Sequence, residues 1–108
     1  MTNPRTETWT IANGETTSNA INKQHLDLCG CLLPTLTGSA VSFLVSLDGV
    51  NYETLSWEGA EVSFDKSGGN ALMWDPLKFR RWPWVKIVSG SSEGAERSIS
   101  PILSDFGG

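Results

Sequence analysis

One stretch constrains the fold of this chain more than any other, and it spans Val41–Leu55 (VSFLVSLDGVNYETL). Its first seven residues place an apolar side chain at every odd-numbered position, which is the period of two that a half-buried β-strand requires. Asp48–Gly49 then interrupts this run with residue types that favour a tight turn. A second extended run, Tyr52–Trp57, follows. The stretch therefore predicts an antiparallel hairpin within a β fold.

In the rest of the chain, short extended runs likewise alternate with residues that favour turns. With 108 residues, 39% of them hydrophobic and 19% charged, the chain is expected to fold as one domain around one core. No run of ten residues has a helical period, and only Pro76–Phe79, with Asp75 as a cap, predicts a helical turn. Further strands are expected at Thr6–Ala12, around Ile21, and at Leu26–Leu33, Gly59–Asp65, Ala71–Trp74, Val85–Ser89 and Arg97–Leu103.

These elements predict an all-β chain: a single antiparallel β-sandwich or jelly-roll-like domain of about seven to eight short strands. Residues 1–5 are expected to form a flexible N-terminal arm, residues 6–103 the β-sandwich, and residues 104–108 a flexible tail. Pro101 cannot donate to a β-ladder, which predicts an edge or a bulge at that position. No apolar run is long enough for a signal peptide or a membrane span, so neither export nor membrane contact is expected.

The sequence offers little for catalysis or metal binding. His25 is the only histidine, and although Asp27 would lie on the same strand face, no nucleophile motif such as G-x-S-x-G accompanies them. Carboxylates such as Glu58 and Glu61 are interpreted as solvated acids. Cys29 and Cys31 are too close in sequence for a relaxed disulfide and are interpreted as buried thiols. We expect a protein that is not an enzyme and that has no cofactor and no metal.

Charge is unevenly distributed along the chain. The formal net charge of −4 argues against general nucleic-acid binding, because such binding depends on neutralising phosphates. Residues 48–65 contain five acids and no Lys or Arg, whereas half of the basic residues fall within nine positions: Lys78, Arg80, Arg81 and Lys86. These two clusters are either solvated edges or surfaces that make complementary contacts between copies of the protein.

Five tryptophans are a high count for a chain of this length. Trp9 and Trp57 occupy inward positions of predicted strands and are assigned to the core. The other three fall out of phase with the apolar pattern or lie beside proline. With two neighbouring arginines they form the predicted subunit or capsid interface, where Trp and Arg often concentrate binding energy: Trp74, Arg80, Arg81, Trp82 and Trp84. Exposed indoles in a β-sandwich are equally suited to holding a carbohydrate.

Several segments together resemble small β-sandwich proteins encoded among the virion structural genes of tailed bacteriophages. The resemblance covers about residues 16–103 and rests on Thr17–Ile21, Leu33–Pro34, Val41–Tyr52, Asp75–Pro76 with Phe79, Val85–Gly90, and Arg97–Ile99.

This resemblance implies a non-enzymatic capsid decoration or cement protein, made in the host cytoplasm and located on the capsid surface. Such a protein stabilises the head by binding the major capsid protein and itself, often as a trimer. Related small phage proteins act in the tail or at the head-tail junction. The Trp- and Arg-rich segment 80–84 departs from the family pattern, so the resemblance does not define the contacts made there.

Overall fold

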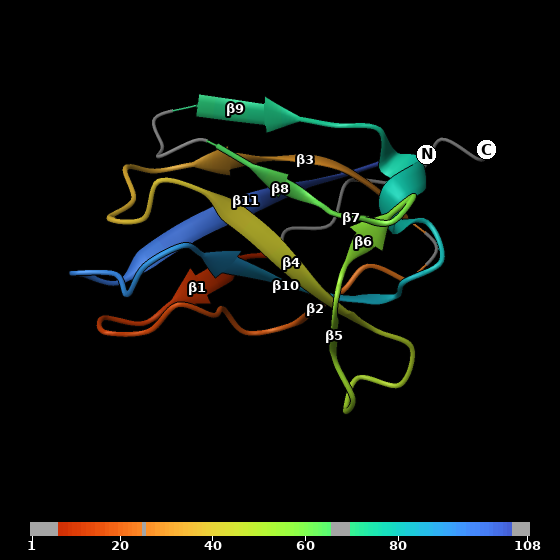
Figure 1. Cartoon of the computed structure of the whole chain (residues 1–108), viewed down its shortest axis with the longest axis horizontal. Coiled ribbons are helices and arrows are strands. Elements are labelled where there is room, and N and C mark those ends of the chain that lie inside the picture. The colour runs from red at the N-terminus through yellow and green to blue at the C-terminus, as the bar shows by residue number, and fades with distance from the viewer. Residues whose placement is uncertain (1–6, 25, 66–69, 105–108) are drawn as a thin grey trace.

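The computed structural model of the chain describes residues 7–24, 26–65 and 70–104 (Figure 1). The predicted all-β class is confirmed. The described residues form eleven strands and one short 3₁₀ helix: β1 Trp9–Ile11, β2 Ile21–Asn22, β3 Asp27–Leu33, β4 Val41–Ser46, β5 Glu53–Thr54, β6 Ser56–Trp57, β7 Ala60–Glu61, β8 Ser63–Phe64, β9 Asn70–Met73, η1 Pro76–Phe79, β10 Trp84–Ser89 and β11 Arg97–Ser104.

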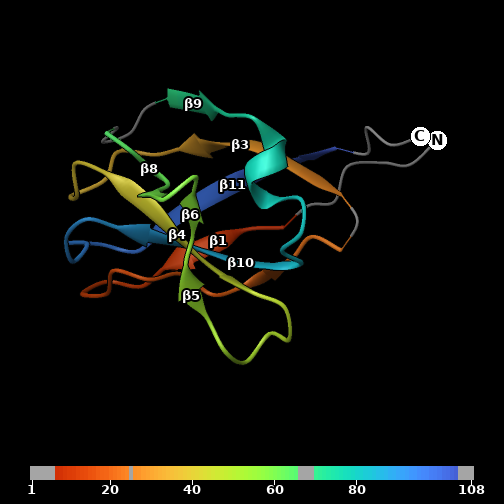
Figure 2. The ribbon, with the colours of Figure 1, turned by 45° about the vertical axis from the view of Figure 1, so that its right-hand side comes forward.

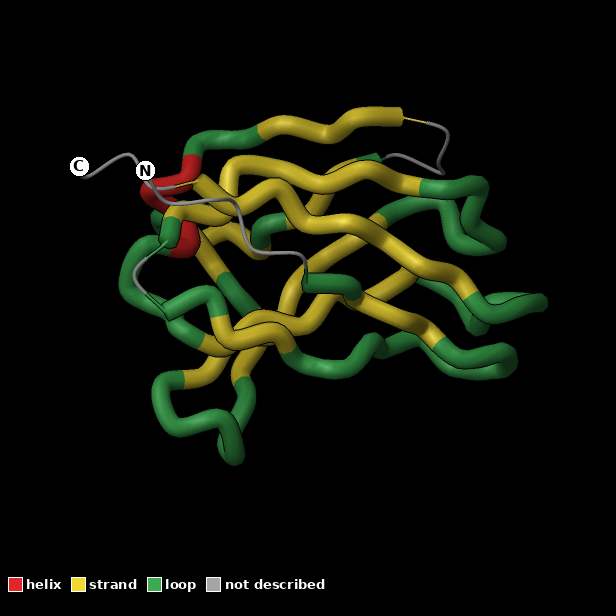
Figure 3. Tube along the Cα trace, turned by 180° about the vertical axis from the view of Figure 1, so that it is seen from behind, coloured by secondary structure: helices red, strands yellow, loops and turns green. Residues whose placement is uncertain are grey.

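Two antiparallel sheets form the layers of a sandwich (Figures 2 and 3). One sheet has the strand order β1-β11-β3-β9. The other has the order β2-β10-β4-β5, and β8 also pairs with β4. The small β6-β7 hairpin belongs to neither sheet. Because the two large sheets each turn an apolar face inward, the side chains between them form one continuous core.

The predicted hairpin provides the central strand of the second sheet. β4 pairs with β10 so that Val45 lies opposite Val85 and Phe43 lies opposite Ile87, and all four side chains are buried. On its other side β4 pairs with β5 across the turn that Asp48–Gly49 predicted. The alternation seen in the sequence therefore corresponds to the buried face of the sheet.

Aromatic rings fill the middle of the core. Phe43 lies 5.0 Å from Phe79 and 5.2 Å from Trp74, between ring centroids, with the rings steeply inclined in both pairs. Trp74 stacks on Phe64 at 5.3 Å with an angle of 10° between the planes. The indole of Trp9 donates a hydrogen bond to the carbonyl of Val85, which joins the two sheets. These offset and edge-on arrangements are the ones that aromatic quadrupoles favour.

The strand count exceeds the predicted seven or eight in part because two predicted strands are each broken at a buried residue, and one of them, Gly59–Asp65, separates at Val62 into β7 and β8. The predicted strand Tyr52–Trp57 separates at Leu55, whose side chain is buried, into β5 and β6. The pairing of β11 with β1 ends at Ile99, before Pro101. The pairing of β11 with β3 shifts register between Ile102 and Leu103, just after Pro101. Pro101 thus lies near an irregularity, as its missing amide donor predicts. β11 also continues to Ser104, which the sequence assigned to the tail.

A buried carboxylate ties four segments together at one end of the sandwich. Glu93 accepts hydrogen bonds from the amides of Thr37 and Gly38, the hydroxyl of Ser89 and the guanidinium of Arg97, at 2.6 to 3.1 Å. Burial acts to raise the pKa of Glu93, but these donors together lower it to about 2. The carboxylate is therefore ionised and fully bonded within the fold.

Several further predictions concern single sites. Cys29 and Cys31 are buried free thiols, as predicted, and burial raises the pKa of Cys31 to about 12. His25, the N-terminal arm and most of the tail lie outside the described residues. Within residues 7–24, 26–65 and 70–104, no helix has the length and apolar character that crossing a membrane demands.

Candidate binding surface

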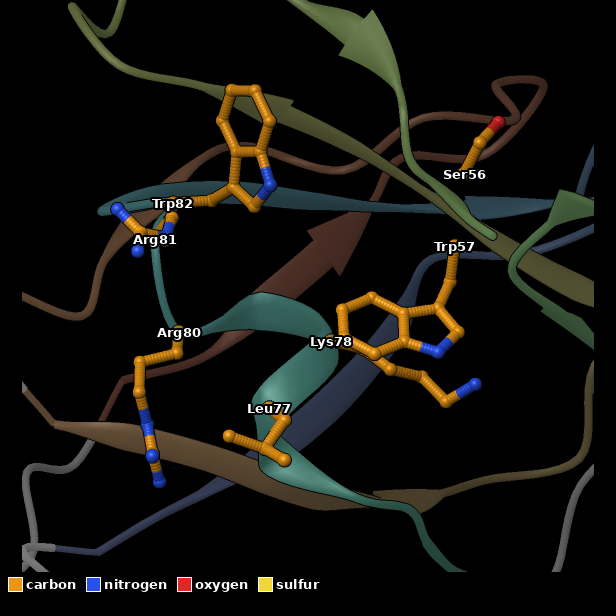
Figure 4. Close-up of a pocket in the computed structure, with 7 residues that line it drawn as sticks. All are labelled: Ser56, Trp57, Leu77, Lys78, Arg80, Arg81 and Trp82. Atoms are coloured by element: carbon orange, nitrogen blue, oxygen red, sulfur yellow. The ribbon is translucent and has the colours of Figure 1, made fainter. Parts of the chain in front are cut away.

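The described surface carries a groove that we call the basic groove, with a volume of about 620 Å³ (Figure 4). Its described lining contains three cationic side chains, two indoles and no carboxylate: Ser56, Trp57, Leu77, Lys78, Arg80, Arg81 and Trp82. Figure 4 shows Trp57 and Trp82 presented by different segments, with Leu77 and Lys78 presented by η1. The groove combines positive charge with flat apolar surfaces.

Local turn chemistry positions the two sides of the basic groove. η1 begins at Pro76, and the Asp75 carboxylate accepts a hydrogen bond from the amide of Leu77, as the sequence predicted. On the opposite side, Glu58 and Gly59 both adopt positive φ, at 53° and 86°, and form the two-residue turn between β6 and β7. This turn places Trp57 at the end of the hairpin, where Lys78 Nζ lies 5.7 Å from its ring centroid.

A buried polar cluster fixes the segment that carries Arg81 and Trp82. The backbone amide of Lys23 donates to the carbonyl of Pro83 at 2.8 Å, and its buried ammonium donates to the carbonyl of Arg80. Arg80 in turn makes two 3.2 Å hydrogen bonds to the buried carboxylate of Asp27. Arg80 is therefore paired with a buried carboxylate, whereas Lys78 and Arg81 form no ion pair among the described residues.

A second, smaller groove shares Trp82 with the basic groove and is acidic. Its volume is about 300 Å³, and its lining consists of Val45, Leu47, Asp48, Asn51, Glu53 and Trp82. The indole of Trp82 thus lines both grooves, and it also packs against the hydrophobic core. A partner that covered both grooves would meet a positive and a negative region that share one large aromatic side chain.

The acidic groove is bordered by a rigid turn. The carboxylate of Asp48 accepts hydrogen bonds from the amides of Val50 and Asn51 and from the side chains of Asn51 and Ser46, which hold its pKa well below the ordinary value. Gly49 has a φ of +79°, and the indole of Trp84 covers its α-carbon so closely that an added Cβ would lie 2.8 Å from the ring. These contacts make the Asp48 segment a closed hairpin turn, with its oxygens engaged internally.

The predicted interface residues therefore separate into three groups: those that line the basic groove, Trp84 on the Gly49 turn, and Trp74 in the core. Arg81 and Trp82 line the basic groove, as does Arg80, although its guanidinium pairs with Asp27. Trp84 lies on β10 and packs on the Gly49 turn rather than lining either groove. The structure brings Arg80, Arg81 and Trp82 together and separates them from the other two tryptophans.

The assignments of two tryptophans are reversed. Trp74 was expected at an interface, but only 9% of it is exposed, and its indole donates to the carbonyl of Leu28 at 2.8 Å within the core. Trp57 was expected in the core, but it is 39% exposed because β6 leaves the sheet after Leu55. The Glu58–Gly59 pair was the available signal, since turn residues directly after Trp57 place it at a hairpin end.

Nothing in the described residues assembles a metal centre. No group of three or more His, Cys, Asp or Glu side chains comes together within the part of the chain that the structure describes. Comparison of the chain with protein-family models, with curated proteins and with solved structures finds no match.

Proposed function

We propose that this protein is a non-enzymatic structural component of a tailed-bacteriophage virion, a capsid decoration protein that binds the major capsid protein through its two grooves. The observation that carries the proposal is the position of Trp82, which lines both the basic groove and the acidic groove. Aromatic and arginine side chains commonly anchor protein interfaces, and charges of both signs around them select the partner and its register.

The small antiparallel sandwich supports the same proposal. Its core is filled by packed aromatic rings, and the polar networks of Glu93 and Asp27 are internally bonded. The bonds of Asp27 and Lys23 hold the segment that carries Arg81 and Trp82, and a preorganised surface loses little conformational entropy when it binds. A preorganised module of this kind is suited to stabilising a shell made of many identical subunits.

The test uses heads of the phage that encodes the protein, prepared without it. The purified protein is expected to co-sediment with these heads in a density gradient, more strongly at low salt than at high salt because the contacts are partly ionic. Arg81→Glu is expected to reduce binding at least tenfold. Lys86→Glu is the matched control, because Lys86 lies outside both grooves, over the ring of Tyr52.

Two results would contradict the proposal. Absence of the protein from sedimenting heads at low salt would remove the capsid assignment, and detection of the protein only in tails or at the head-tail junction would move it elsewhere in the virion. Equal binding by the Arg81 and Lys86 variants would show that the basic groove is not the contact surface.

A carbohydrate-binding module is the second candidate, and one observation favours it. In the acidic groove the indole of Trp82 lies beside the polar side chains of Asn51 and Glu53, a combination of a flat aromatic surface and hydrogen-bonding groups that suits a sugar ring. Titration with oligosaccharides would then change the tryptophan fluorescence of the wild type saturably, and Trp82→Ala would abolish that change.

A further inference from the structure

The first sheet ends in a free strand edge, which belongs to β9. β9 occupies the end of the order β1-β11-β3-β9, and among the described residues no strand pairs with its outer side. Figures 1 to 3 all place β9 at the margin of the fold. The strand, Asn-Ala-Leu-Met, has no charge and no proline, although natural edge strands commonly carry such residues to block pairing with another chain.

The hydrogen bond that follows β9 reveals which of its backbone groups face outward. The amide of Trp74 donates to the carbonyl of Cys29 on β3 at 2.9 Å. Because successive residues of an extended strand direct their amide and carbonyl groups to opposite sides, those of Leu72 also face β3. The amide and carbonyl groups of Ala71 and Met73 therefore face the free edge.

The side chains of the same two residues lie on the outer, solvent-facing side of the sheet. Ala71 pairs with Leu32, and Met73 pairs with Gly30, which its sulfur atom covers. Met73 and Leu32 are 58% and 51% exposed. A solvent-exposed apolar surface thus continues from β3 to the unpaired edge of β9.

We propose that β9 pairs with β9 of a second copy of this chain, antiparallel and across a two-fold axis that passes beside Leu72. In this register Ala71 of each copy lies opposite Met73 of the other. Each such pair has its amide and carbonyl groups facing the partner, so each exchanges both backbone hydrogen bonds of an antiparallel ladder. The two first sheets then form one continuous sheet.

A second copy is the occupant because this edge is complementary to itself. The two outward-facing residues are placed symmetrically about Leu72, which is the condition for an isologous two-fold contact. Residues opposite one another in the pair also share a sheet face, so the exposed side chains of Met73 and Leu32 from both copies join into one apolar surface. No charge on either strand opposes this approach. The resulting assembly is a dimer, in contrast to the trimer that the sequence resemblance implies.

The test is the solution mass of the full chain by light scattering, measured from about 10 µM to about 1 mM, because an edge contact of this size forms a weak interface. The mass is expected to rise from that of the 11.7 kDa chain to twice that value. Ala71→Pro removes an outward-facing amide and should abolish dimerisation without disturbing the pairing with β3. Met73→Lys should do the same, whereas Ser98→Lys, on the same face of β11, should not.

Hydrogen exchange gives a second measurement that depends on the proposed register. The amides of Ala71 and Met73 should exchange more slowly as protein concentration rises, whereas the Leu72 amide, which faces β3, should not change. A mass that stays at one chain throughout, or that reaches three chains, would overturn the proposal. So would a dimer that both the Ala71 and the Met73 variants leave intact. Circular dichroism of each variant establishes that the monomer remains folded.

Discussion

The ammonium of Lys23 donates a hydrogen bond to the backbone carbonyl of Arg80, 57 positions further along the chain, at a distance of 3.4 Å. Lys23 is almost completely buried, and its ammonium also donates to the carbonyl of Leu26. Burial lowers the pKa of Lys23, the charge of Asp27 opposes this shift, and the charge of Arg80 adds to it. The segment that carries Arg81 and Trp82 is therefore held by a buried ammonium whose charged form the folded state disfavours relative to water.

The lowered pKa of Lys23 predicts that the free energy of unfolding depends on pH in the alkaline range. Because the pKa of Lys23 is lower in the folded state than its ordinary value of 10.5, the unfolded chain binds more protons, and this residue's contribution to stability increases as pH rises toward 10.5. Lys23→Met keeps the volume of the side chain and removes the titration. The free energy of unfolding, measured by denaturant between pH 7 and 10.5, should rise with pH for the wild type relative to the variant. A constant difference between the two proteins would contradict the lowered pKa.

The Glu93 carboxylate predicts a pH dependence of the same sign, but in acid. Its folded pKa of about 2 lies below its ordinary value of 4.5, so its stabilising contribution is complete above pH 4.5 and is lost as pH falls toward 2. Glu93→Gln leaves some of the donors around this site unsatisfied and should cost about 2 to 4 kcal/mol at pH 7. Denaturant unfolding of both proteins from pH 7 to 2 should show this difference shrinking. A difference independent of pH would assign the effect to packing.

The reversed tryptophans provide a matched pair of substitutions. Trp74→Ala removes a buried indole that stacks on Phe64 and should destabilise the protein by about 3 to 5 kcal/mol. Trp57→Ala removes a partly exposed indole and should cost less than about 1 kcal/mol. The free energies of unfolding in urea measure both effects. Equal costs would mean that Trp57 is buried in solution or that Trp74 is not.

Gly49 is expected to be sensitive for two separate reasons. Alanine there would have to adopt a φ of +79° and would place its Cβ 2.8 Å from the Trp84 ring. Gly14→Ala is the control, because Gly14 also has a positive φ, of 87°, but open space where a Cβ would lie. Backbone strain alone should cost about 1 kcal/mol at Gly14, and the indole contact should raise the cost at Gly49 to about 2 to 3 kcal/mol. Thermal denaturation of the two variants separates strain from crowding, and equal losses would contradict the contact.

The sequence singled out part of the candidate surface, whose role as an interface stays a prediction. Arg80, Arg81 and Trp82 were identified from their charge and from their position beside proline, and all three line the basic groove. Lys78 was recognised only as a member of the basic cluster. Leu77 and Ser56 were not singled out, because neither carries a signal of its own in the sequence. They reach the groove through the capped turn of η1 and the separate β6-β7 hairpin.

The sequence by itself determined the antiparallel β class, the hairpin built on Val41–Leu47, and the capped turn at Pro76. Each depends on residues close together in the chain, where periodicity, turn propensity and capping act directly. Only the tertiary structure decided which tryptophan is buried and which is exposed, and that Lys23 would anchor the carbonyl of Arg80. Those outcomes depend on contacts between residues distant in sequence: Trp74 is enclosed by Phe43, Phe64 and Phe79, whereas the loss of sheet pairing after Leu55 leaves Trp57 at the surface.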